Sequence, residues 1–177
     1  MTEACYVANK LMKGYIGSAN IDTNSRLCMA STVVGHKRAF GADVVPGCYE
    51  DLEIADLVIL TGSNLAWCHP VLNQRLRAAK EKHGTKIIVI DPRRTASCDI
   101  ADLHLPIKPG SDVALFNGLL AWLDQTGNTD LRYIARHVSG YEQAVAEARA
   151  DCPDIETTAQ KCGLDTQESA DEIGSGL

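Results

Sequence analysis

Two short apolar runs separated by an amphipathic segment constrain the fold of this chain more than any other feature. The first run is ADLVIL at residues 55–60, and the second is KIIVI at residues 86–90. Continuous apolar runs are typical of parallel strands that are covered on both faces. The segment between them, residues 71–83, repeats its apolar positions at helical spacing and stops at Gly84. A strand, a helix and a strand joined by short loops predict a parallel sheet with a right-handed crossover.

Further elements are predicted on both sides of this unit. A third strand is expected at residues 102–106, followed by a helix at residues 113–124 that Ser111 or Asp112 caps. Four more helices are expected, at residues 6–13, 29–40, 131–137 and 141–150. We therefore predict the α/β class, with helices flanking a Rossmann-like parallel sheet in three layers.

The charge of the chain is unevenly distributed, and it excludes some partners. Of the 17 Lys and Arg and 23 Asp and Glu residues, residues 1–150 hold 16 bases and 16 acids. The net charge of −6 therefore lies in residues 151–177. We expect residues 1–162 to form one domain and residues 163–177 a frayed acidic tail. Neither stretch has the basic face of a nucleic-acid site, and no apolar run approaches the roughly 18 residues of a membrane helix, so neither partner is expected.

The seven cysteines contain no C-x-x-C pair. Their spacing therefore does not support a zinc ribbon, a thioredoxin-like motif or an iron–sulfur cluster. The odd number and the absence of a basic-then-apolar start favour a reducing compartment, in which most thiols are buried packing residues. Cys28 differs, because it follows a polar loop and precedes a predicted helix, with Arg26 nearby; both features favour a thiolate. The alternative for Cys28 is a buried structural cysteine.

Polar loops follow each of the three predicted strands. They are Thr61-Gly62-Ser63-Asn64, Asp91-Pro92-Arg93-Arg94-Thr95 and Lys108-Pro109-Gly110-Ser111-Asp112. The carboxyl ends of parallel strands lie at the same edge of a sheet, where open α/β folds bind their ligands. We therefore predict that these first, second and third loops form one rim around a ligand site.

The residue types of the rim suit a nucleotide. The glycine of the first loop lets the backbone approach a ligand, and Ser63 and Asn64 offer donors for phosphate oxygens. Arg93 and Arg94 offer paired donors for phosphate, and Asp112 offers acceptors for a guanine edge or a ribose hydroxyl. The alternatives are a turn and cap in the first loop, solvated surface charges at the two arginines and an N-cap at Asp112. Neither G-x-G-x-x-G nor the P-loop motif is present, so a standard NAD or ATP site is not predicted.

Two long stretches carry a family resemblance. They are NKLMKGYIGSANIDTNSRLCMASTVVGHKRAFGADVVPGCYEDLEIADLVILTGSNLAWCHPVLNQR and IDPRRTASCDIADLHLPIKPGSDVALFNGLL. Together they resemble the molybdopterin oxidoreductases of the dimethyl-sulfoxide-reductase superfamily, and most of all the catalytic subunits of bacterial assimilatory nitrate reductases. The resemblance covers about residues 5–165.

The resemblance implies a role for Cys28 and for each loop of the rim. Cys28 occupies the cysteine of the family segment N-x-R-x-C-M-(A or S)-S, which makes it the expected catalytic residue and the thiolate ligand of molybdenum. The third loop is expected to hold the guanosine end of a molybdopterin guanine dinucleotide. The first loop matches the family's W-G-S-N loop, with Thr61 where many relatives have Trp. The expected cofactor-binding residues are Asn24, Thr61, Gly62, Ser63, Asn64, Cys68, Asp91, Pro92, Arg93, Arg94, Thr95, Gly110, Ser111 and Asp112.

The resemblance also implies an activity. The expected parent enzyme reduces nitrate to nitrite by oxygen-atom transfer in the cytoplasm, with bis-molybdopterin guanine dinucleotide and molybdenum. A 4Fe-4S cluster of the parent would lie outside this chain, which we expect to be an inactive fragment. Its expected partners are the remainder of the parent chain and an electron-donor protein or reductase domain. Formate dehydrogenases of this pattern usually have His after the metal-binding residue, whereas Met29 follows Cys28 here, which favours nitrate. The alternatives are a formate dehydrogenase, another superfamily oxidoreductase, or a non-catalytic nucleotide-binding or interaction module.

Overall fold

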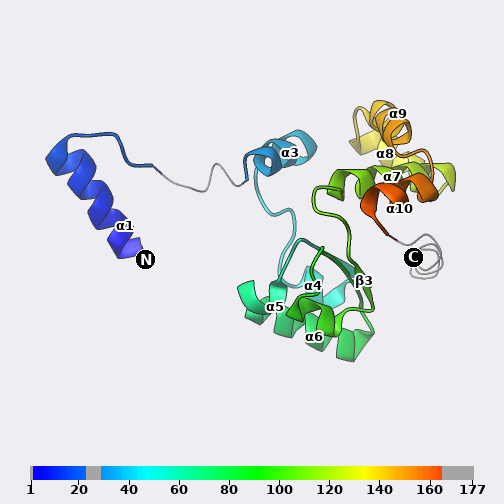
Figure 1. Ribbon diagram of the computed structural model, residues 1–177, viewed down its shortest axis with the longest axis horizontal. Coiled ribbons are helices and arrows are strands. Elements are labelled where there is room, and N and C mark those ends of the chain that lie inside the picture. The colour runs from blue at the N-terminus through cyan, green and yellow to red at the C-terminus, as the bar shows by residue number, and fades with distance from the viewer. Residues whose placement is uncertain (1, 23–28, 165–177) are drawn as a thin grey trace. The chain divides into compact units, whose positions relative to one another are not determined.

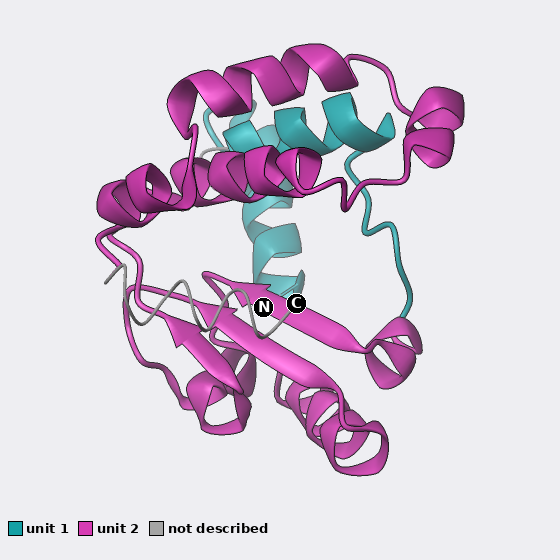
Figure 2. Cartoon of the chain, turned by 90° about the vertical axis from the view of Figure 1, so that its right-hand side faces the viewer, with its two compact units in different colours: residues 1–48 teal, residues 49–177 magenta. Residues whose placement is uncertain are grey.

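The computed structural model describes residues 2–22 and 29–164 (Figure 1). The chain divides into two compact units, residues 1–48 and residues 49–177 (Figure 2), and each is described by itself. The predicted domain limits at residues 1–162 and 163–177 stay a prediction.

The first unit is helical. Helix α1 (Thr2–Asn9) leads into the π-helical segment η1 (Lys10–Ile16), and helix α3 (Ala30–Phe40) follows. The two predicted helices of this region are thus confirmed, although the first is longer than expected. None of the described residues in these helices is buried.

The second unit contains a parallel sheet. Within the described residues its strands are β1 (Leu57–Thr61), β2 (Lys86–Ile90) and β3 (Leu103–Leu105), in the order β1-β2-β3. Helix α6 (Pro70–His83) connects β1 to β2. All three strands and the connecting helix were predicted, because apolar runs and helical spacing are strong signals.

Helices cover both faces of this sheet, which gives the predicted three layers (Figure 2). On one face, Ile87 and Val89 pack with Leu76 of α6. On the other, Ile90 packs with Leu115 of helix α7 (Asp112–Gln125). Alternate residues of β2 therefore enter two different cores, as a strand covered on both faces requires.

Other helices complete the second unit. Helices α8 (Leu131–His137) and α9 (Tyr141–Asp151) were predicted within a residue of their bounds. The elements that were not predicted are α4 (Asp51–Ile54), α5 (Leu65–Cys68), η2 (Ala96–Ile100) and α10 (Ile155–Cys162). Three of these are single turns, too short to show a helical period in the sequence. No described helix is long and apolar enough to cross a membrane.

The described cysteines fall into two groups. Cys98, Cys152 and Cys162 are buried, as predicted for packing residues. The same prediction is wrong for the other three, because these cysteines are exposed: Cys5, Cys48 and Cys68.

Candidate functional site

The three predicted loops follow the carboxyl ends of β1, β2 and β3 and lie at one edge of the sheet. Backbone hydrogen bonds continue the sheet into them. Gly62 N donates to Ile90 O at 2.8 Å, and Asp91 N donates to Leu105 O at 3.2 Å. The first loop is thus tied to the end of β2, and the second to the end of β3. Because the three strands are parallel neighbours, the three loops leave the sheet at the same edge. That they form one rim around a ligand stays a prediction.

In the first loop, the side chain of Asn64 does not cap the helix that follows, α5 (Leu65–Cys68). Asn64 occupies the N-cap position of α5, yet its side chain makes no cap hydrogen bond. Its backbone carbonyl instead accepts from Trp67 N at 3.1 Å and Cys68 N at 2.9 Å. Gly62 has a φ of +56°, a conformation that favours glycine, with no other group within 4 Å of where a Cβ would lie. Asn64 therefore takes the cap position of the alternative interpretation, but its side chain makes no capping hydrogen bond.

In the second loop, Asp91 shapes the backbone. Its Oδ1 accepts from Arg93 N at 2.8 Å, and its carbonyl oxygen lies 2.9 Å from Nε2 of His104. The Arg93 and Arg94 side chains are exposed. Thr95 is 93% buried, and its hydroxyl has no hydrogen-bond partner among the described residues. A buried hydroxyl without a partner costs free energy, so Thr95 is an unsatisfied polar group among the described residues of the rim.

Ser97 joins the first two loops and was missed by the sequence analysis. It lies in η2 and is fully buried. Its Oγ accepts from Ala66 N at 3.1 Å and lies 3.5 Å from Oδ1 of Asn64. A serine in a single turn gives no periodic signal, and its partners come from the first loop and α5, more than 30 residues earlier in the chain.

In the third loop, the Ser111 hydroxyl is hydrogen-bonded within the loop, whereas the Asp112 side chain is exposed. Ser111, not Asp112, takes the N-cap position of α7. Its hydroxyl donates to Lys108 O at 2.6 Å, so its proton is already used within the loop. Asp112 is the first residue of the helix and its side chain is exposed. The interpretation of Asp112 as a cap is wrong, and its carboxylate is the acceptor that this loop presents.

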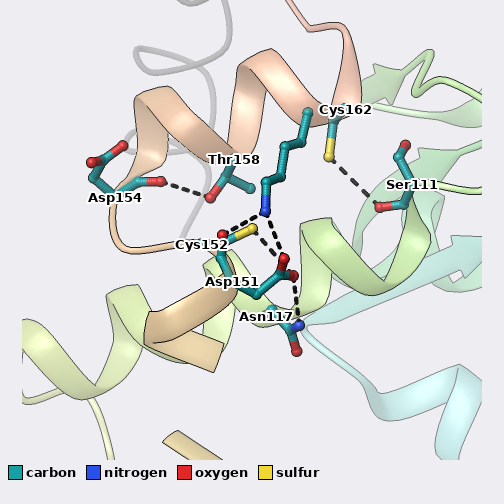
Figure 3. A network of polar contacts seen from close by, with 8 residues as sticks. Ser111, Asn117, Asp151, Cys152, Asp154, Thr158 and Cys162 are labelled. Carbon is teal, nitrogen blue, oxygen red and sulfur yellow. Dashed lines mark hydrogen bonds and ion pairs between the residues drawn. The ribbon is translucent and has the colours of Figure 1, made fainter. Parts of the chain in front are cut away.

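The third loop is anchored to the helices behind it (Figure 3). Lys108 N donates to Cys162 O at 2.7 Å, and the Cys162 thiol lies 3.7 Å from Ser111 O. Burial raises the pKa of the thiols of Cys162 and Cys152. A buried thiol with a raised pKa is a poor nucleophile, so these cysteines are packing groups that support the loop.

A polar network holds α10 against α7 and α9 in the same region (Figure 3). Lys161 Nζ lies 2.6 Å from Oδ1 of Asp151, and Asn117 Nδ2 donates to Oδ2 of Asp151 at 2.9 Å. The hydrogen bond from Lys161, followed by that from Asn117, lowers the pKa of Asp151. These groups satisfy one another, which indicates a structural role.

Some of the remaining predicted site residues lie in the described part of the chain, and others lie outside it. Ser63 is half-buried in the first loop, whereas Pro92 and Cys68 are exposed. Asn24 and Cys28 lie outside the described residues, so their expected contacts with the pterin and molybdenum are untested. Within residues 2–22 and 29–164, no group of three or more His, Cys, Asp or Glu side chains is arranged to hold a metal ion.

The fold and the rim define an open α/β protein whose candidate ligand site lies beyond the carboxyl ends of parallel strands. The profile of the family described as molybdopterin oxidoreductase matches residues 1–134. The chain therefore belongs to the molybdopterin oxidoreductase family.

Named relatives and a solved structure agree with this family. The chain is 55% identical over 172 residues to a nitrate reductase of Klebsiella oxytoca, covering 97% of this chain and 19% of the relative. It is 50% identical over 164 residues to a nitrate reductase of Shewanella frigidimarina, covering 93% and 18%. The structure of acetylene hydratase from Pelobacter acetylenicus matches with a TM-score of 0.70 and 27% identity, over 86% of this chain and 20% of that chain. The chain thus spans about a fifth of the length of these relatives.

Proposed function

We propose that this chain is part of a molybdenum enzyme that reduces nitrate to nitrite, and that its rim holds the guanosine diphosphate end of a molybdopterin guanine dinucleotide. Relatives named nitrate reductase at 50% and 55% identity support the reaction. The structural likeness to an acetylene hydratase means that the fold alone does not decide the chemistry. The observation that carries the binding proposal is the convergence of three loops whose polar groups are not all used within the protein.

The chemistry of the rim fits this part of the cofactor. A guanosine diphosphate moiety carries phosphate oxygens that accept hydrogen bonds and a guanine edge that donates them. The amide of Asn64, the unpartnered hydroxyl of Thr95 and the exposed guanidinium groups of Arg93 and Arg94 are donors for oxygen. The exposed carboxylate of Asp112 is the matching acceptor for the guanine edge.

In this proposal the cofactor supplies the chemistry, and the residues of this chain bind and orient the cofactor. When bound, the molybdenum cofactor supplies the two-electron oxygen-atom transfer that converts nitrate to nitrite. The rim residues would bind and orient the nucleotide end, and none of them is required as an acid or base. Cys28, two residues before α3 begins, is the proposed thiolate ligand of the metal.

The proposal extends to the rest of the enzyme. The remainder of the parent chain would complete the cofactor site and carry a 4Fe-4S cluster, and an electron-donor protein or reductase domain would supply electrons. We propose a cytoplasmic enzyme of nitrate assimilation, in keeping with the expected reducing compartment.

The role of Cys28 is tested in the full-length parent protein by replacing Cys28 with Ala. We expect loss of nitrate reduction and a changed molybdenum spectrum, because a metal ligand is removed. Cys5→Ala is the matched control, since Cys5 is an exposed cysteine of α1. Normal nitrate reduction with an unchanged spectrum in Cys28→Ala would contradict the role. Formate is assayed beside nitrate, and turnover of formate alone would replace the nitrate proposal by a formate dehydrogenase.

The binding role of the rim is tested on this chain alone. Titration with millimolar GDP, followed by nuclear magnetic resonance, should shift the backbone signals of Gly62, Arg93 and Asp112. No shift at these three positions would contradict nucleotide binding by the rim.

A further inference from the structure

A chain of two hydrogen bonds connects η2 to the first loop through a buried side chain. Ala66 N donates to Oγ of Ser97 at 3.1 Å, and the Ser97 hydroxyl is directed to Oδ1 of Asn64 at 3.5 Å. Ser97 has no solvent exposure, and Asn64 is half-buried. Both contacts therefore form away from bulk water, where the choice of donor and acceptor has energetic consequences.

The burial of Ser97 fixes the direction of this chain. Its oxygen already accepts from Ala66 N, so its own proton needs an acceptor. Among the described residues, the acceptor within reach is Oδ1 of Asn64. Reversing the Asn64 amide would place an NH2 group against the serine and leave the buried hydroxyl proton without an acceptor. The amide oxygen of Asn64 consequently faces Ser97.

This orientation determines what Asn64 presents to a ligand. The oxygen and nitrogen of a carboxamide lie in its plane on opposite sides of the Cβ–Cγ bond, so the NH2 group points away from Ser97 when the oxygen faces it. No hydrogen bond from this NH2 group to a described residue is formed, and the side chain does not cap α5. With respect to residues 2–22 and 29–164, Asn64 thus keeps its NH2 group as a donor at the rim, while its oxygen is used by Ser97.

We propose that Ser97 is a positioning residue, which turns the Asn64 amide so that its NH2 group donates to a phosphate oxygen of the bound nucleotide. The inference rests on the proposed nucleotide-binding function of the rim and adds to it a residue that does not touch the ligand. The 3.5 Å separation is long for a hydroxyl donor, and we expect ligand binding to Asn64 to shorten it.

The experiment measures GDP affinity by calorimetry on the full chain for Ser97→Ala, Ser97→Thr, Asn64→Ala and the double variant Ser97→Ala/Asn64→Ala. Ser97→Ala should weaken GDP binding by about tenfold, the effect of one neutral hydrogen bond. Ser97→Thr, which keeps the hydroxyl, should restore affinity. The double variant should bind no more weakly than Asn64→Ala alone, because Ser97 acts through Asn64.

Thr85→Val is the matched control. Thr85 is also a buried hydroxyl residue, and its Oγ1 donates to Ala55 O at 2.9 Å. It lies directly before β2, at the sheet edge opposite to the rim. This variant should lower the melting temperature and leave GDP affinity unchanged. It therefore separates loss of a buried hydrogen bond from loss of positioning.

Two further readouts keep the proposal testable if Ser97→Ala does not fold. In that case Ser97→Thr, which keeps the hydroxyl, is used instead, and the side-chain NH2 signals of Asn64 in its 15N spectra should match those of the wild type without nucleotide and shift when GDP is added. Asn64→Asp keeps an acceptor for Ser97 but removes the donor, so it should fold normally and lose GDP binding at least as severely as Asn64→Ala. Retained GDP binding in Asn64→Asp, or additive losses in the double variant, would overturn the role of Ser97. A wild-type chain that does not bind GDP would refute the function of the rim, whereas the Asn64 signals would still decide its orientation.

Discussion

The two edges of the sheet differ in how completely their polar groups are satisfied. At the amino edge, the Asp102 carboxylate accepts from Ile87 N at 2.8 Å and pairs with Lys80 at 2.9 Å. Lys80 also donates to Ile100 O at 2.8 Å, and Thr85 donates to Ala55 O at 2.9 Å. At the carboxyl edge, Thr95 has a buried hydroxyl without a partner among the described residues.

This difference indicates that the polar groups of the two edges have different roles. The amino edge uses them to hold α6 and the strands together, which contributes stability. At the carboxyl edge, hydrogen-bond donors lack partners among the described residues, which lowers the free energy of unfolding. This is expected where a ligand supplies the missing partners. Substitutions at the amino edge should therefore lower the free energy of unfolding without changing binding, and those at the rim should weaken binding without lowering the free energy of unfolding.

The largest effect is expected away from both edges, where α7 touches α10. A Cβ on Gly118 would lie 2.8 Å from Cβ of Thr158 and closer still to two other atoms of its side chain. Gly118→Ala should lower the free energy of unfolding by about 3 kcal/mol, because the helices must move apart. Denaturant unfolding measures this, and Gly35→Ala is the control, since Gly35 of α3 has open space around it. If the two variants were equally stable, the close contact between the helices would be refuted.

An intermediate effect is expected for Asp102→Asn at the amino edge. Burial raises the pKa of Asp102, but the hydrogen bonds from Lys80 and Ile87 N outweigh it and lower the pKa below its usual value. The variant should be less stable at pH 7 by about 1.5 kcal/mol. Because the folded pKa lies below the unfolded value, this contribution is complete above pH 4 or so and disappears as the pH falls through the folded pKa.

Unfolding curves measured between pH 2 and pH 7 or so test this dependence. Wild type and Asp102→Asn should converge at the acid end. Asp99→Asn is the control, since Asp99 is an exposed carboxylate of η2. A stability difference that persisted unchanged at the lowest pH would show that the charge of Asp102 is not the cause.

The sheet and the rim could be predicted from the sequence because their signals are local. The apolar runs of β1 and β2 and the polar residues that follow them are contiguous, and parallel strands bring their carboxyl ends together. The contact between Asn64 and Ser97 could not be predicted, because the residues are 33 positions apart and η2 has no hydrophobic period. Composition also does not predict that the backbone carbonyl of Asn64, and not its side chain, accepts the hydrogen bonds at the start of α5.

Helix α10 shows a different limit of sequence analysis. Its buried residues are Thr158, Ala159 and Cys162, which lie at helical spacing but have small side chains, so the apolar stripe was present and was missed. Its burial depends on Gly118, which allows close approach from a distant helix. The capping side chain of Asp154, which accepts from Thr157 N at 2.6 Å, was the signal that could have located its start.

The comparison between the two edges is tested most directly by replacing one threonine with valine at each edge, in two separate variants. Thr95→Val removes a buried hydroxyl that has no partner in the described part of the chain, so it should raise the free energy of unfolding by about 1 kcal/mol and weaken GDP binding. Thr85→Val removes a hydroxyl that donates to Ala55 O, so it should lower stability and leave binding unchanged. Thermal unfolding and calorimetry measure both. Equal signs of the stability change would break the distinction between the two edges.

The smallest effect is expected for Arg93→Gln at the rim. The Arg93 side chain is exposed, so its loss should change the free energy of unfolding by less than about 0.5 kcal/mol. GDP binding should weaken by about three- to tenfold, because a charge-assisted contact to phosphate is lost, and the loss should shrink as salt is added. Arg77→Gln is the matched control, since Arg77 is an exposed arginine of α6 and lies in none of the three rim loops. If both variants weakened binding equally, the general charge of the chain rather than the rim would attract the nucleotide, because only a contact at the rim depends on which arginine is removed.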